Sequence, residues 1–179
     1  MKRYAVDTNV FLNIFRREDP FLKASLRVFM AANKKKIHLI VSEVVLTELL
    51  VGVCLSPQPR ISRRKLDRFL TMTQIQMIPN TAQVLEEAAR GFSEYLSKRG
   101  AMFQCPKCGE FVKLACPSCG VTISPRERVL PDFLVGAHAT IHANGLVTRE
   151  RSIYEMYFPS LELLTPEEIL SQVSPPRQM

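Results

Sequence analysis

The chain has 179 residues, which is enough for one domain of ordinary size with a small addition. Its apolar fraction of 46% is typical of a globular protein with a real core, and no apolar run reaches the roughly 20 residues that a membrane span requires. The 24 Lys and Arg against 17 Asp and Glu leave a net charge of +7, which favours an anionic partner, most often nucleic acid.

The first predicted element is a short apolar strand that ends at Asp7, and a helix over about residues 10–15 follows it. In an open α/β sheet, sites form at the carboxyl ends of the strands, so Asp7 lies where chemistry usually occurs. The alternative is that Asp7 only caps the helix. Polar residues interrupt this apolar run and argue against a signal peptide, so we expect a cytoplasmic, reducing setting.

The next elements are a helix that begins near Pro20, a buried parallel strand at 37–41, and a helix at 43–54. The helix at 43–54 has almost no polar face, so we expect it to be largely buried, with Cys54 as a core thiol. Glu48 then needs a partner, because burial of an unpaired carboxylate costs on the order of several kcal/mol. A structural salt bridge is the alternative to a functional role.

Two further helices, around residues 65–71 and 81–99, flank a short strand at 75–78. The segment after them contains two copies of the turn C-P-x-C-G. Two such turns supply the four sulfurs of a tetrahedral zinc site, and a site closed by four protein ligands should be structural. Disulfides are the alternative, which a reducing setting disfavours. The four predicted zinc ligands are Cys105, Cys108, Cys116 and Cys119.

Pro131 and Asp132 open the next predicted helix, and the helix dipole favours a carboxylate in this first turn. Capping alone would explain Asp132. His138 and His142 are four residues apart on the same helix, a spacing that can bind metal. No matching third ligand is apparent, so solvated or hydrogen-bonded histidines are the better interpretation.

A short strand at 146–148 follows, and Glu150, like Asp7, lies just past a strand end. We expect a last strand at 161–164, a short terminal helix, and a disordered tail at 174–179. Alternating helices and buried strands predict a parallel sheet covered on both faces.

In such a sheet, four acids from distant segments can converge on one crevice: Asp7, Glu48, Asp132 and Glu150. Clustered carboxylates repel each other. A hard divalent cation such as Mg²⁺ or Mn²⁺, which prefers oxygen ligands, keeps them ionised.

Four segments together resemble the PIN-domain family, particularly its VapC-like branch. They are V-D-T-N-V-F-L at the N-terminus, T-E-L-L-V-G at 47–52, P-D-F-L-V-G-A-H-A from Pro131, and G-L-V-T-R-E from Gly145. The resemblance implies a three-layer α/β/α sandwich with a central parallel sheet, formed by residues 1–99 and 129–173. A zinc-ribbon insertion at 100–128 departs from the plain family pattern.

The resemblance also implies a metal-dependent ribonuclease site. By this likeness Asp7, Glu48 and Asp132 are the acidic trio, and Glu150 stands where the family more often has Asp. Asn9 and Thr148 match polar positions that support the cluster. The implied reaction is hydrolysis of an RNA phosphodiester bond, assisted by Mg²⁺ or Mn²⁺, with a 5′-phosphate and a 3′-hydroxyl as products.

Basic residues near the acids and in the insertion are candidates for phosphate contacts, or else plain surface charges. They are Arg149, Arg151, Lys107, Lys113, Arg126 and Arg128. The insertion would contact RNA or a protein, or only stabilise the fold. The resemblance implies a homodimer and, for a toxin, an antitoxin partner. The alternative is a catalytically weak RNA- or protein-binding module on the same scaffold, for example in RNA processing or ribosome maturation.

Overall fold

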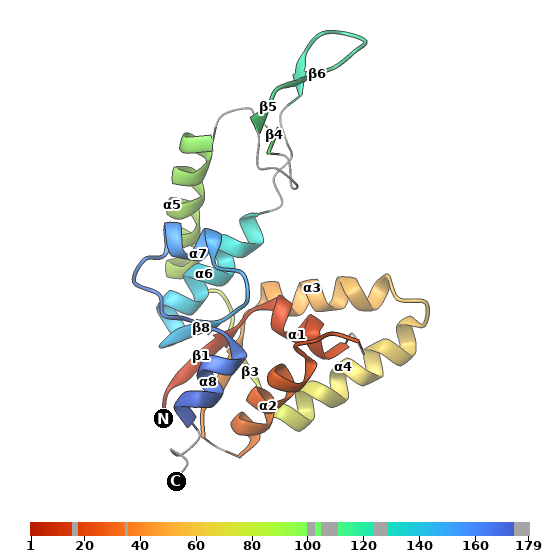
Figure 1. Ribbon diagram of the computed structural model, residues 1–179, viewed down its shortest axis with the longest axis vertical. Helices are drawn as coiled ribbons and strands as arrows, with labels where there is room; N and C mark the ends of the chain where they lie inside the picture. The colour runs from red at the N-terminus through yellow and green to blue at the C-terminus, as the bar shows by residue number, and fades with distance from the viewer. Residues whose placement is uncertain (16–17, 35, 100–102, 105–110, 124–128, 174–179) are drawn as a thin grey trace.

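The computed structural model describes residues 1–15, 18–34, 36–99, 103–104, 111–123 and 129–173 (Figure 1). The tail expected at 174–179 lies outside these residues. Among the described helices, none is both long and apolar enough to cross a membrane.

Five parallel strands form the central sheet, in the order β3-β2-β1-β8-β9. They are β1 (Arg3–Val6), β2 (His38–Val41), β3 (Gln76–Met77), β8 (Gly145–Val147) and β9 (Leu163–Leu164). The predicted parallel sheet is thus confirmed. β1 is the middle strand, and Ala5 pairs with Ile40 on one side and Leu146 on the other. Because both neighbours run parallel to β1, the carboxyl ends of the three strands meet at one edge.

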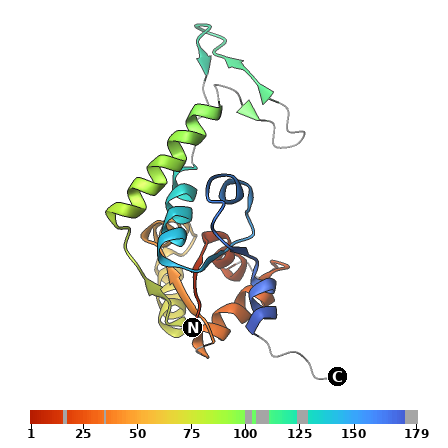
Figure 2. The ribbon, with the colours of Figure 1, turned by 90° about the vertical axis from the view of Figure 1, so that its left-hand side faces the viewer.

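Helices cover both faces of this sheet. α5 (Ala82–Arg99) and α6 (Leu130–His142) lie on one face, and α1 (Thr8–Phe15), α2 (Leu22–Asn33) and α8 (Pro166–Val173) lie on the other (Figure 2). The remaining helices are α3 (Glu43–Cys54), α4 (Pro59–Thr73) and α7 (Ser152–Tyr157). Packed aromatic rings fill both layers of the core: Phe11, Phe29 and Phe69 on one side, and Phe133, Tyr157 and Phe158 on the other.

The expectation of a largely buried helix at 43–54 was wrong. Only Val45 and Leu49 of α3 are buried, whereas Val51 is 52% and Leu55, just past the helix, 80% exposed. α3 begins at the edge of the sheet and then extends beyond it, so its second half packs against α4 instead of the sheet (Figure 1). Cys54 is consequently exposed, and its interpretation as a core thiol was also wrong.

Two small antiparallel sheets project beyond the end of α5 (Figures 1 and 2). β4 (Phe103–Gln104) pairs with β5 (Phe111–Val112), and β6 (Leu114–Ala115) pairs with β7 (Thr122–Ile123). Each predicted C-P-x-C-G turn therefore falls between the two strands of one pair. The described part of the insertion is a pair of short β-hairpins.

Gly136 provides a test of how closely α6 packs. A Cβ built at Gly136 would lie 2.5 Å from Cε2 of the buried Phe158 ring. We expect Gly136→Ala to destabilise the protein by about 1–3 kcal/mol, because the ring cannot move without disturbing the core. Gly52→Ala in α3 is the matched control, since its Cβ would meet open space. That change should stabilise by roughly 0.5–1 kcal/mol. Urea unfolding of both variants measures the difference, and equal effects would contradict this packing.

Candidate active site

Asp7 directly follows β1 and is only 7% exposed. Its backbone N–H donates to the Val147 carbonyl over 3.0 Å, which continues the β1–β8 ladder by one residue. Three side chains donate to its Oδ2 atom: Thr148 over 2.6 Å, Asn9 over 2.7 Å and Tyr154 over 3.4 Å. Burial raises the pKa of Asp7, and the hydrogen bond from Thr148 partly opposes this rise.

Thr148 links Asp7 to the turn that follows β8. Its hydroxyl donates to Asp7 and accepts from Asn9 Nδ2 and from the Glu150 N–H, each over 3.0 Å. One donor and two acceptor positions are the full capacity of a hydroxyl. The Arg149 N–H also donates to Asn9 Oδ1 over 3.3 Å. The side chains of Asn9 and Thr148 therefore fix the turn after β8 to the start of α1.

The other three acids reach the same region from different elements. Glu48 lies on α3 and accepts a hydrogen bond from the Thr8 hydroxyl. Asp132 lies in the first turn of α6. Glu150 is exposed, and the Ser152 hydroxyl donates to its Oε1 atom over 2.7 Å.

The charges of these acids act on one another. Burial, together with the negative charges of Asp7, Glu48 and Glu150, raises the pKa of Asp132 to about 7. In the part of the chain that the structure describes, no Lys or Arg lies within ion-pair distance of Asp7, Glu48 or Asp132. The four predicted acids thus lie close enough for their charges to act on one another, and we refer to these four residues as the acid pocket.

Tyr154 on α7 belongs to this pocket, and the sequence analysis missed it. Its side chain is 1% exposed, and its hydroxyl contacts Asp7. Burial and the charges of Asp7 and Asp132 raise the pKa of the phenol, so the hydroxyl stays protonated and can only donate to Asp7 at neutral pH. No spacing in the sequence marks this residue, because its approach depends on how α7 folds over the strand ends.

The chemistry of the donors fits a hard divalent cation, since carboxylate oxygens are the ligands that Mg²⁺ and Mn²⁺ prefer. Among the described residues, no three His, Cys, Asp or Glu side chains already surround one point as metal ligands. The fit therefore rests on the kind and the charge of the donors.

Two predicted phosphate contacts are engaged within the protein. Arg149 donates to Asn13 Oδ1 over 3.1 Å, pairs with Glu167 over 2.9 Å, and stacks 3.8 Å above the ring of Phe21. Arg151 donates to the Leu163 carbonyl over 2.7 Å. Lys113 is exposed, whereas the remaining candidates, Lys107, Arg126 and Arg128, lie outside the described residues.

Half of the predicted zinc site is described. Cys116 and Gly120 form a tight turn in which the Gly120 N–H donates to the Cys116 carbonyl over 2.8 Å, with Gly120 at φ +72°. Hydrogen bonds from the backbone N–H groups of Ser118 and Cys119 lower the pKa of the Cys116 thiol. Cys105 and Cys108 lie outside the described residues, so the four-cysteine site stays a prediction.

Of the two histidines of α6, His138 follows the hydrogen-bonded alternative, whereas the buried Nε2 atom of His142 has no hydrogen-bond partner among the described residues. His138 is buried, and its Nε2 atom lies 3.0 Å from the Ile78 carbonyl oxygen. The rings of His138 and His142 are 5.0 Å apart. Burial lowers the pKa of His138.

A family model described as "PIN domain" matches residues 4–104, more than half of the chain. The chain therefore belongs to the PIN domain family, as its motifs predicted. No curated protein matches the chain.

Solved structures with the same fold cover nearly the whole chain. VapBC2 from Rickettsia felis, crystallised with a promoter DNA fragment, has a matching chain with a TM-score of 0.62 and 21% identity, covering 91% of this chain and 98% of its own. DNA-bound VapBC from Salmonella typhimurium matches with a TM-score of 0.62 and 15% identity, over 93% and 99%. FitAcB from Neisseria gonorrhoeae matches with a TM-score of 0.60 and 17% identity, over 92% and 98%. At these identities the likeness shows the fold alone.

We expect Asp132→Asn to stabilise the metal-free protein at pH 8, by roughly 1–2 kcal/mol once partial exposure is allowed for. The folded-state pKa of about 7 lies above the ordinary 3.8. The folded protein thus binds more protons than the unfolded chain between these values, and its stability falls as the pH rises through this window. The neutral amide avoids that loss, so its advantage should disappear near pH 4.

Thermal unfolding in EDTA at pH 4, 6 and 8 measures this difference. Glu86→Gln on α5 is the control, because it removes an exposed carboxylate that forms no ion pair with the described residues. A stabilisation that does not change with pH would contradict the conclusion that burial and the neighbouring carboxylates raise the pKa of Asp132.

Proposed function

We propose that the chain is a metal-dependent endoribonuclease, which hydrolyses RNA phosphodiester bonds at the pocket of Asp7, Glu48, Asp132 and Glu150. The observation that carries this proposal is the uncompensated acid cluster at the carboxyl ends of the strands of a PIN domain. PIN domains generally use Mg²⁺ or Mn²⁺, and the donors here suit these ions.

In this proposal Asp7, Glu48 and Asp132 hold the cation directly, and the exposed Glu150 acts from the rim, in part through water. The cation, when bound, supplies Lewis acidity toward the phosphate and acidifies a water molecule. The protein contributes orientation. Asn9, Thr148 and Tyr154 fix the rotation of the Asp7 carboxylate, and Thr8 fixes that of Glu48. Groups that orient metal ligands are typically worth about 10–100-fold in metal affinity or activity.

Asp7→Asn should abolish cleavage, because the amide keeps the shape of the side chain and loses its charge. Thr148→Val should reduce activity or Mn²⁺ affinity by about 10–100-fold. The assay incubates purified protein with structured and unstructured RNA, with Mn²⁺ or with EDTA, and Glu86→Gln, which removes an exposed carboxylate on α5, serves as the control. Cutting that survives Asp7→Asn would reject the proposed site.

The second candidate function is a binding module that holds RNA or a protein and cuts poorly. One observation favours it: no three described acidic side chains are already arranged around one point. Absence of cutting under every condition above, with RNA binding retained, would support this alternative over the nuclease.

We propose that the insertion binds one structural zinc ion through Cys105, Cys108, Cys116 and Cys119. The turn at Cys116 supports this, because its backbone N–H groups already favour the thiolate that zinc requires. We expect one zinc per chain by elemental analysis, and its loss in Cys116→Ser. Cys54→Ser, which removes an exposed thiol outside the insertion, should retain the metal. A wild-type protein without stoichiometric zinc would overturn this proposal.

We further propose a toxin role with a small antitoxin as partner, and a homodimer as the assembled form. The VapC-like motifs and the fold shared with VapBC and FitAcB chains support this role. A cytoplasmic location is part of the same proposal. The corresponding genetic observation would be an adjacent reading frame for a small protein.

A further inference from the structure

Helix α4 carries most of the net charge of the protein. Its 15 residues include five Lys or Arg and one Asp, a net charge of +4 against +7 for the whole chain. The five basic residues are Arg60, Arg63, Arg64, Lys65 and Arg68. Such a concentration on one helix calls for an explanation, because like charges one turn apart destabilise a helix by a few tenths of a kcal/mol each.

Three of these residues form a stripe on the solvent side of the helix. Leu66 and Phe69 face the core, where Phe69 packs against the ring of Phe29. Arg60, Arg64 and Arg68 lie opposite to them, each one turn from the next, and span about 12 Å along the axis. All three are exposed. We call them the arginine stripe.

The arginine stripe has no partner within the described structure. Arg63, on the flank of the helix, is neutralised by Asp67 at 2.8 Å. For Arg60, Arg64 and Arg68, by contrast, none of the described carboxylates is close enough to form an ion pair. The stripe therefore contributes nothing to the fold through ion pairing, and its guanidinium groups remain available to a ligand.

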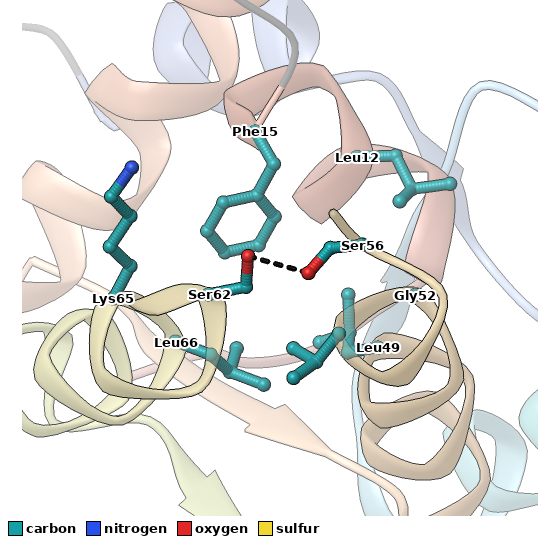
Figure 3. Close-up of a pocket in the computed structure, with 9 residues that line it drawn as sticks. Leu12, Phe15, Leu49, Gly52, Ser56, Ser62, Lys65 and Leu66 are labelled. Atoms are coloured by element: carbon teal, nitrogen blue, oxygen red, sulfur yellow. Dashed lines mark hydrogen bonds between the residues drawn. The ribbon is translucent and has the colours of Figure 1, made fainter. Parts of the chain in front are cut away.

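A groove lies between this helix, α3 and α1 (Figure 3). It has a volume of about 280 Å³ and lies between Leu12 and Phe15 of α1, Gly52 of α3, and Lys65 of α4. Leu12 and Gly52 are each one helical turn beyond Thr8 and Glu48, which hydrogen-bond to each other at the pocket. A hydrogen bond of 2.9 Å between Ser56, in the loop after α3, and Ser62 of α4 lies at the groove. The groove thus lies about one helical turn from Glu48. It is lined mainly by apolar residues and includes Lys65.

We propose that the arginine stripe binds the phosphate backbone of single-stranded RNA, and that Lys65 and the groove lead this strand to the acid pocket. This inference rests on the proposed nuclease function. Evenly spaced guanidinium groups suit the phosphates of a nucleic acid. A protein partner would call for an apolar centre in its interface. The solvent side of α4 is instead mainly charged or polar. Its exposed large apolar side chains, Ile61 and Met72, lie near opposite ends of the helix and form no continuous apolar centre.

The test measures RNA binding in a protein that does not cut. In the Asp7→Asn background, the triple variant Arg60→Gln, Arg64→Gln, Arg68→Gln is titrated against an unstructured RNA at several salt concentrations. Loss of three phosphate contacts on a single strand should lower the slope of log affinity against log salt by about 2. The affinity should fall roughly 10-fold or more at low salt. Thermal unfolding confirms that the variant is folded.

A second triple variant provides a charge-matched control. Arg27→Gln, Lys34→Gln and Lys36→Gln remove the same charge from exposed positions at α2 and just beyond it. These changes should leave the salt slope nearly unaltered. Equal losses in both triple variants would show a bulk charge effect and overturn the proposal, as would an unchanged slope in the stripe variant.

Two further measurements distinguish RNA from other ligands, and distinguish failure of this proposal from failure of the proposed nuclease function. If the stripe variant lost affinity only for duplex DNA, or only for a poly-glutamate peptide, the stripe would belong to another partner and the proposal would fall. With Asp7 intact, the stripe variant should cut a dinucleotide like wild type but show a raised KM for long RNA. Absence of cutting by wild type would refute the nuclease function and leave the binding result to decide on the stripe alone.

Discussion

The mutual repulsion of acids held away from water is the constraint on which the rest of this structure depends. Asp7 is almost completely buried, and Asp132 has a pKa near neutrality because burial and three other carboxylates act on it together. A fold can hold such groups only where their surroundings are rigid. Here that rigidity comes from the middle of the sheet, where β1 is paired on both sides and the Asp7 N–H continues the ladder with β8. The hydroxyl and amide donors on Oδ2 then recover part of the hydration that Asp7 loses.

The position of Asp132 depends on packing rather than on hydrogen bonds. One turn after Asp132, the absence of a side chain at Gly136 lets α6 approach the Phe158 ring closely. Phe158 directly follows α7, the helix that carries Tyr154 to Asp7. The contact between Gly136 and Phe158 therefore holds two helices against the carboxyl end of β1. They are α6, which carries Asp132, and α7, which carries Tyr154. This coupling explains how residues far apart in the chain reach one pocket.

Local patterns were sufficient to predict the five strands of the parallel sheet and most of the helices around it, but not α7. A carboxylate just past a buried strand, as at Asp7 and Glu150, is predicted to lie at the edge of a parallel sheet where sites usually form. The exposure of α3 could not be predicted in this way, because an apolar helix looks the same whether it covers a sheet or extends past its edge. Likewise, the contact of Tyr154 with Asp7 and the stacking of Arg149 on Phe21 depend on long-range packing that no spacing encodes.

The acids and the basic residues of α4 lie on different parts of the molecule, and this separation bears on how a polyanion could approach the acid pocket. Four carboxylates repel the polyanion that the proposed reaction requires, and a single bound cation offsets only part of this charge. In about 0.15 M salt the repulsion is screened beyond roughly 8 Å. A basic surface placed farther away than this can attract a strand without pairing with the acids and displacing the cation from them. α3 provides that distance, since its last residue, Cys54, lies six residues and about 9 Å beyond Glu48. The exposed extension of α3, which leaves the sheet without covering it, thus sets α4 and its arginine stripe at a separation where attraction and metal binding act independently.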